Sequence, residues 1–228
     1  MDYSKPYRAV ESSIVNVITF ENGNVCSTAT GAIIDDGKKV LTCSHCCNNS
    51  LSTGIYDKNR GKPCRGEIIF DDQTNDIAII GFSFIVGNPL KIVKSDSIEI
   101  GNEVFTVGFP YKFKSEKTLT VGNVAAFEDG LIKINTSVNN GNSGGPLLNM
   151  NGEIIGVVNS KLGRLSVFLE SIEKQNPQAF MKIGGVDPIQ VIQQMIREMQ
   201  QNLNLGIGYA IPSIKVAAVT DIVSQIMK

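Results

Sequence analysis

The chain has 228 residues, of which 42% are hydrophobic and 19% are charged, and its formal net charge is −1. This length and composition fit a globular protein that can bury a substantial hydrophobic core. A net charge so close to zero gives no basis for electrostatic capture of nucleic acid or of an anionic membrane, so neither is expected as a partner.

The N-terminal residues 1–8 contain no basic stretch followed by an apolar core, so no secretory signal is predicted there. The longest largely apolar run, residues 77–87, is too short to span a bilayer. An odd number of cysteines favours free thiols over a disulfide framework. Together these features predict a cytoplasmic protein. The five cysteines are Cys26, Cys43, Cys46, Cys47 and Cys64.

Short segments rich in β-branched residues recur along most of the chain, separated by turn dipeptides such as Asn22-Gly23 and Asp129-Gly130. Many short strands at this spacing predict an all-β barrel or sandwich, and the absence of alternating helices argues against a parallel α/β sheet. Strands are expected over residues 13–20, 31–34, 39–42, 67–70, 77–80, 103–107, 117–127, 131–136 and 153–159.

Two helical segments are predicted after the strands. Asp187-Pro188 reads as an N-cap followed by proline at the first helical position, and apolar residues then recur at helical spacing up to Leu203. This helix belongs to a helical insertion over about residues 163–203. The apolar spacing within residues 213–228 predicts a second, C-terminal helix.

Ser143 lies in the segment Gly-Asn-Ser-Gly-Gly-Pro-Leu at residues 141–147. A serine hydroxyl is a weak nucleophile at neutral pH and needs a base to take its proton. The chain contains one histidine, His45, and the ordinary pKa of imidazole suits that task. The imidazole in turn needs a carboxylate that fixes its tautomer. Asp76 is favoured because a strongly apolar run follows it, whereas Asp71 and Asp72 lie in a polar stretch.

Several motifs in order carry a family resemblance. Residues 30–34 and 41–45 contain Thr-Gly-Ala-Ile-Ile and Leu-Thr-Cys-Ser-His, residues 75–80 read Asn-Asp-Ile-Ala-Ile-Ile, and the Ser143 segment follows. With histidine, aspartate and serine in this order, the chain resembles the trypsin-like serine peptidases. The segments 101–110 and 206–213 make the resemblance narrower, to the HtrA branch, here without a PDZ module.

The resemblance implies two six-stranded antiparallel β-barrels with the active site between them. Residues 1–90 would form the first barrel, carrying His45 and Asp76. Residues 91–228 would form the second, carrying Ser143, the helical insertion and the C-terminal helix. The implied activity is hydrolysis of peptide bonds by a serine endopeptidase through an acyl-enzyme, with protein or peptide substrates and no cofactor.

Carried over residue by residue, His45 is the general base and acid, Asp76 orients it and Ser143 is the nucleophile. The backbone N–H groups of Gly141 and Ser143 would form the oxyanion hole. Asn142 stands where secreted trypsins have an aspartate that pairs with a new N-terminal amine. Because Asn142 is neutral, activation by N-terminal cleavage is not expected.

The implied substrate pocket involves Ser137, Asn159 and Ser160. No acidic residue stands at the pocket base near Ser137, so a small or medium apolar side chain is expected in place of arginine or lysine. The strands on either side of the insertion over 163–203 border this pocket in the family, so the insertion is expected near it. It is expected either to gate the cleft or dock a partner, or simply to pack an apolar stripe on the barrel.

Two alternatives remain open from the residues. Cys43 and Cys46 beside His45 are compatible with a zinc site, but no second cysteine pair of this kind exists and ligation would remove the base, so no metal is expected. The second alternative is a trypsin-fold regulatory or binding module that is inactive until a regulatory partner or fused domain assembles the cleft.

Overall fold

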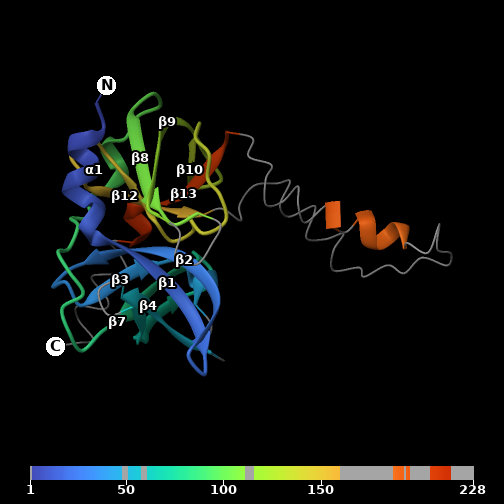
Figure 1. Cartoon of the computed structure of the whole chain (residues 1–228). Coiled ribbons are helices and arrows are strands. Elements are labelled where there is room, and N and C mark those ends of the chain that lie inside the picture. The colour runs from blue at the N-terminus through green and yellow to red at the C-terminus, as the bar shows by residue number, and fades with distance from the viewer. Residues whose placement is uncertain are drawn as a thin grey trace.

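The computed structural model describes residues 2–47, 51–57, 61–110, 116–159, 187–192, 194–195 and 206–216. It is built mainly of strands, as the sequence predicts. The strands β1 to β7 form one half of the molecule and the strands β8 to β13 the other, with the short helix α1 beside the second half (Figure 1). The all-β class is therefore confirmed.

The first half is a seven-stranded antiparallel sheet in the order β5-β4-β1-β2-β3-β7-β6. A closed barrel of six strands was expected here, and that detail is wrong. The edge strands β5 and β6 of the sheet are consecutive in the chain but do not pair, and Gly66, which links them, donates its N–H to the carbonyl of Thr53 in β4 at 3.0 Å. The strands are β1 (Ile14–Glu21), β2 (Asn24–Ile34), β3 (Lys39–Thr42), β4 (Ser52–Asp57), β5 (Lys62–Arg65), β6 (Glu67–Asp72) and β7 (Ile77–Gly81).

The second half is a closed barrel of six strands in the order β10-β13-β12-β11-β8-β9, in agreement with the predicted barrel. Its closure removes the exposed edges that an open sheet would leave. The strands are β8 (Glu103–Gly108), β9 (Thr118–Glu128), β10 (Leu131–Ile134), β11 (Pro146–Leu148), β12 (Ile154–Asn159) and β13 (Gly208–Pro212).

Strand alternation divides the core into two clusters. In β8, Val104 packs with the cluster that contains Ile132 and Leu147, whereas its neighbour Phe105 packs with the larger cluster, which contains Ile33 and Ile80 of the first sheet. Successive side chains of a strand point to opposite faces, so β8 contributes to both cores. The larger cluster thus joins the two halves by apolar contact.

The helix α1 (Ser4–Val10) was not predicted. It has seven residues and no side-chain hydrogen bond at its N-cap, so the sequence carries no strong start signal. It is held by packing: the ring of Tyr3 meets Phe105 edge-on at 6.1 Å between centroids, and Val10 is buried. Three short 3₁₀ turns complete the described elements: η1 (Glu11–Ser13), η2 (Ser44–Cys46) and η3 (Ser95–Ser97).

The predicted helix start at Asp187 is confirmed. Residues 188–192 and 194–195 are helical, and Asp187 Oδ1 accepts a hydrogen bond from the N–H of Ile189 at 2.8 Å. Residues 213–216 are also helical, as predicted. The rest of the segments 163–203 and 213–228 lies outside the described residues, and so does any role in gating. Of the helices that the structure describes, none is long and apolar enough to cross a membrane.

The strands of the two halves lie on either side of residue 90, at residues 14–81 and 103–212. The division of the chain into units 1–90 and 91–228 remains a proposal.

Candidate active site

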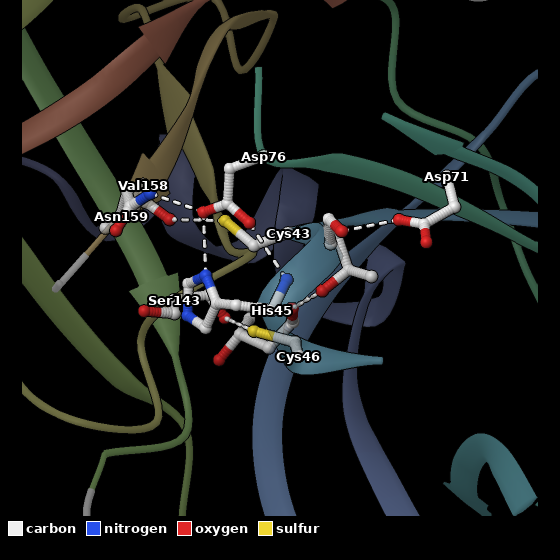
Figure 2. Close-up of polar contacts among 11 residues, drawn as sticks. Cys43, His45, Cys46, Asp71, Asp76, Ser143, Val158 and Asn159 are labelled. Carbon is white, nitrogen blue, oxygen red and sulfur yellow. Dashed lines mark hydrogen bonds and ion pairs between the residues drawn. The ribbon is translucent and has the colours of Figure 1, made fainter. Parts of the chain in front are cut away.

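The imidazole of His45 and the carboxylate of Asp76 are in direct contact. The turn η2, which follows β3, carries His45, and Asp76 immediately precedes β7, the neighbour of β3 in the sheet. His45 Nδ1 lies 2.7 Å from Asp76 Oδ2, and the two side chains are 19% and 23% exposed (Figure 2). The sequence-predicted pair is therefore brought together at a partly solvated position.

Hydrogen bonds fix the direction of this pair. Asp76 Oδ1 accepts from the backbone N–H of His45 at 2.9 Å, and Asp76 Oδ2 also accepts from Asn159 Nδ2 at 2.5 Å. A carboxylate that receives these donors acts as an acceptor toward the ring as well, which places the ring proton on Nδ1. In the neutral imidazole the lone pair is then on Nε2, the form that a general base requires.

The backbone of Asp76 is unusual, since its φ is +56°. Aspartate occupies this left-handed region more readily than most residues other than glycine, at some conformational cost. Here the conformation places the carboxylate so that it meets both the N–H and the ring of His45. The backbone strain at Asp76 is therefore found at the residue whose carboxylate must be aimed at His45.

A second carboxylate holds the turn that carries His45. Ser44 Oγ donates to Asp71 Oδ1 at 2.5 Å, and Asp71 belongs to β6. Asp71 and Asp76 therefore contact the same turn at adjacent residues, and only Asp76 touches the imidazole (Figure 2). The preference for Asp76 over Asp71 as the partner of His45 agrees with this geometry.

The loop that carries Ser143 depends on two glycines. Gly141 has φ +95° and Gly144 has φ +83°, a region that side-chain-bearing residues rarely adopt. At Gly144 there is also no space, because a Cβ atom would come within 2.1 Å of Thr42 Oγ1 and 2.3 Å of the Thr30 carbonyl. The serine loop can therefore press against β2 and β3 only with glycine at position 144.

Thr30, which is fully buried in β2, ties this loop to the first sheet. Its N–H donates to the carbonyl of Ser143 at 3.0 Å, and its hydroxyl donates to the carbonyl of Gly141 at 2.6 Å. The same hydroxyl accepts from the N–H of Phe109 at 3.0 Å, and the Thr30 carbonyl accepts from Thr42 Oγ1 at 2.8 Å. Thr30 is a positioning residue that sequence reasoning missed, although it begins one of the family motifs.

The side chain of Asn142 is buried, at 2% exposure, and its Oδ1 has no hydrogen-bond partner within the described part of the chain. It lies against Gly108, where an added Cβ atom would come within 2.7 Å of Asn142 Oδ1. A neutral amide tolerates this position far better than a carboxylate, which would carry an unpaired charge. The structure thus gives a physical reason for asparagine at position 142.

Three amides of the serine loop are used internally. The N–H groups of Asn142, Gly144 and Gly145 donate to the carbonyls of Asn139, Val158 and Asn142, at 2.9, 2.9 and 3.0 Å. These three are therefore directed away from an anion site. The assignment of the oxyanion hole to the amides of Gly141 and Ser143 remains a proposal.

The cysteines around His45 change its electrostatics. Burial lowers the pKa of His45, but the hydrogen bond with Asp76 and the neighbouring Cys46 outweigh this effect and raise the pKa to about 9. The hydrogen bond with Cys43 lowers the pKa of Cys46 to about 6, with help from His45 and against the effect of burial. Burial raises the pKa of Cys47 to about 12. Cys46 therefore favours the protonated ring, which must lose a proton before it can act as a base.

The three residues predicted to line the substrate pocket lie in different surroundings. Asn159 donates its amide to Asp76, a contact that the sequence interpretation did not foresee. Ser137 is half-buried in a segment that lies against the start of β13, since a Cβ atom at Gly208 would come within 2.4 Å of Val138. Ser160 lies outside the described residues. A pocket formed by these three residues stays a prediction.

Sequence comparison relates the chain to known peptidases. A family profile described as "Trypsin-like peptidase domain" matches residues 29–157. The periplasmic pH-dependent serine endoprotease DegQ of Escherichia coli is 34% identical over 143 residues, which are 56% of this chain and 30% of DegQ. A serine protease described as HtrA-like from Staphylococcus haemolyticus is 24% identical over 249 residues, covering 90% of this chain and 37% of that protein. The chain thus spans about a third of these relatives.

Solved structures agree on the fold. The HtrA-type protease AlgW, solved with a tripeptide, superimposes with a TM-score of 0.67 at 20% identity, covering 97% of this chain and 63% of AlgW. A serine endoprotease from Yersinia pestis gives a TM-score of 0.69 at 22% identity, covering 98% of this chain and 66% of that one. These structures show the shared fold, and the sequence relatives above confirm the resemblance to the HtrA branch.

The comparisons correct the predicted location. Relatives from Escherichia coli, Chlamydia trachomatis and Salmonella typhimurium are all named as periplasmic endoproteases, so the prediction of a cytoplasmic protein is wrong. An odd cysteine count shows that one thiol has no partner within the chain, but it does not identify a compartment.

The steric constraint at Gly144 can be separated from its backbone angle. Gly23 has nearly the same φ, +81°, but open space around its Cα, so Gly23→Ala should cost only about 1 kcal/mol of unfolding free energy. Gly144→Ala adds a backbone collision and should cost about 3 kcal/mol or more. Urea unfolding of both variants checks this, and equal losses would contradict the tight contact between the loop and β2.

The burial of Asn142 predicts a pH-dependent loss of stability in Asn142→Asp. An unpaired buried carboxyl has a folded-state pKa above its unfolded value, so the penalty is fully present at higher pH and disappears as pH falls below the unfolded pKa. At neutral pH the loss should be about 2–4 kcal/mol. Asn24→Asp, at an exposed position, is the matched control and should show no such pH dependence. Unfolding free energies between pH 4 and pH 8, spanning roughly the range in which a carboxyl with a raised pKa titrates, provide the measurement.

Proposed function

The chain belongs to the trypsin-like peptidase domain family, and we propose that it is a serine endopeptidase that hydrolyses peptide bonds through Ser143, His45 and Asp76. One observation carries the assignment of the base: His45, the only histidine of the chain, contacts Asp76 through Nδ1 at 2.7 Å. The serine loop is joined to the same region, because Cys46 Sγ lies 3.7 Å from the carbonyl of Ser143.

In the proposed reaction, Ser143 Oγ attacks the carbonyl carbon of the scissile bond while His45 Nε2 takes the hydroxyl proton. Asp76 holds the ring through Nδ1–H and stabilises the imidazolium that forms. The N–H groups of Gly141 and Ser143 bind the oxygen on which negative charge develops. His45 then protonates the leaving amine, and water releases the acyl group from Ser143 by the same steps in reverse order.

The rigidity of the site has a source outside the three residues. Thr30 holds the carbonyls on both sides of Asn142, those of Gly141 and Ser143, at 2.6 and 3.0 Å. The N–H of Ser143 shares its planar peptide unit with the carbonyl of Asn142, which accepts from the N–H of Gly145 at 3.0 Å. Thr30 thus anchors the loop, and the Ser143 donor of the proposed oxyanion hole is held in place before substrate binds, which is the condition under which such donors act most strongly.

Substrate choice and location extend the proposal. Ser137 at the expected pocket base is neutral, which favours small or medium apolar side chains at the cleaved bond. The periplasmic relatives support a position outside the cytoplasm for this chain as well. Buried, neutral Asn142 supports activity without N-terminal cleavage.

Covalent labelling tests the nucleophile. A fluorophosphonate probe should label the folded full-length chain, and Ser143→Ala and His45→Ala should each abolish labelling, because the first removes the attacking atom and the second its base. Intact-mass measurement identifies the adduct. A wild-type chain that is folded by circular dichroism but remains unlabelled would instead favour the inactive binding module.

Two matched substitutions test the role of Asp76. In Asp76→Asn the amide favours the wrong tautomer of His45, so kcat on a peptide substrate should fall by roughly 10⁴-fold. Asp71→Asn makes the same chemical change on the other side of the turn, where an amide oxygen still accepts from Ser44, so its effect should be far smaller. Equal losses in the two variants would mean that Asp76 acts only through the shape of the turn.

A further inference from the structure

Three potential metal ligands meet at the turn that carries the proposed base. Sγ of Cys43, Sγ of Cys46 and a ring nitrogen of His45 all lie within 4.8 Å of one another. Cys43 is fully buried at the N-cap of η2 and Cys46, 8% exposed, ends the same turn. Sequence reasoning set a metal aside because no second cysteine pair exists, yet the turn alone supplies three ligands.

Beyond their contacts with each other and with His45, the two thiols are only weakly engaged in the protein. Cys43 Sγ donates to the carbonyl of Val158 at 3.4 Å, and Cys46 Sγ donates to the carbonyl of Ser143 at 3.7 Å (Figure 2). Thiols are weak donors, so exchanging these contacts for metal bonds costs little. Loss of the second contact would, however, release one of the hydrogen bonds on the serine loop.

The ligand set suits zinc better than a hard cation. Zn²⁺ takes thiolate sulfur at about 2.3 Å and imidazole nitrogen at about 2.0–2.1 Å in a tetrahedral arrangement. Those lengths separate neighbouring ligand atoms by roughly 3.5–3.8 Å, so the cluster needs to contract by about 1 Å. Mg²⁺ and Ca²⁺ prefer oxygen ligands and do not match two sulfurs and a nitrogen.

Charge also favours the binding of a divalent cation here. Zn²⁺ binding needs both cysteines as thiolates and a ring nitrogen with a free lone pair, so the protons that these groups carry pass to solvent, and two thiolates then balance the charge of the ion. A neutral cluster can occupy a buried position that a single charged group could not. Asp76 next to His45 supplies the carboxylate that metal-bound histidines commonly contact.

From this arrangement we propose that Cys43, His45 and Cys46 form a zinc site that reversibly switches off the peptidase. Its inhibitory part rests on the proposed function, whereas metal binding itself does not. Zinc on either nitrogen of His45 prevents catalysis. On Nε2 it occupies the lone pair that takes the serine proton, and on Nδ1 it leaves the ring proton on Nε2, which then has no lone pair to act as a base.

Three protein ligands leave the fourth position of a tetrahedral ion open. Water, or a group of a bound peptide, completes the coordination. The site therefore differs from a structural zinc site, whose four protein ligands are required for folding. Here the protein folds around free thiols and the ion acts on the reaction.

Metal binding is tested first without reference to activity. The reduced full-length chain is titrated with Co²⁺, whose absorption reports tetrahedral coordination and thiolate ligation. Wild-type protein and Ser143→Ala should both give the thiolate-to-cobalt band, and added Zn²⁺ should remove it by displacement. Cys43→Ser and Cys46→Ser should each weaken cobalt binding by about tenfold or more.

The matched control lies next to the site. Cys47 directly follows Cys46 but does not belong to the ligand group, so Cys47→Ser should bind cobalt as wild type does. A thiolate band that persists in both Cys43→Ser and Cys46→Ser, or that is lost in Cys47→Ser, would overturn the proposed ligand set. A wild-type chain that shows no thiolate band would overturn the site itself.

The regulatory step is tested on peptide hydrolysis, with every rate expressed relative to the same variant in chelator. Zn²⁺ should inhibit the wild type and Cys47→Ser, and a chelator should restore their rates. Cys43→Ser and Cys46→Ser should need about tenfold or more Zn²⁺ for the same fractional inhibition. Cobalt binding without zinc inhibition would contradict the switch. If Ser143→Ala binds cobalt and the wild type hydrolyses nothing, the proposed function fails while the metal site stands.

Discussion

Thr30 lies where the first sheet meets the loop of Ser143, and its hydrogen bonds hold the two together. His45 and Asp76 lie next to strands of the first sheet, and Ser143 lies in a loop of the barrel, so their chemistry depends on how closely these halves are joined. The N–H and hydroxyl of Thr30 hold the carbonyls of Ser143 and Gly141. Gly144 makes this approach sterically feasible, because any side chain there would meet Thr30 and Thr42.

The turn that carries His45 has a second set of neighbours with an opposing effect. Asp76 directs the ring proton to Nδ1 and prepares Nε2 as a base, with Asn159 supporting the carboxylate. Cys46 favours the protonated ring and, with Cys43, offers sulfur ligands beside it. The same turn therefore carries the proposed base, His45, and the two thiols that would inactivate it by binding zinc together with its imidazole.

Much of this site could be predicted from the sequence because its parts are local. The strand over residues 39–42 and the pairing of His45 with Asp76 follow from β-branched residues and from motif order, and the structure contains both. The strands β4, β5 and β11 were missed because glycine or proline stands within each or at its start and few of their residues are β-branched. The contacts of Thr30 and Asn159 depend on residues far apart in the sequence, so no local pattern predicts them.

The single histidine offers the most direct measurement of the central claim, that His45 is a base held by Asp76 and serving Ser143. Nitrogen-15 NMR of His45 in the chelator-treated protein needs no assignment, because only one imidazole is present. The account predicts a proton on Nδ1 in a strong hydrogen bond that disappears in Asp76→Asn, and ring resonances that shift when Ser143 is phosphonylated. A ring protonated on Nε2 alone, whose resonances stay the same in Asp76→Asn and after phosphonylation of Ser143, would contradict it.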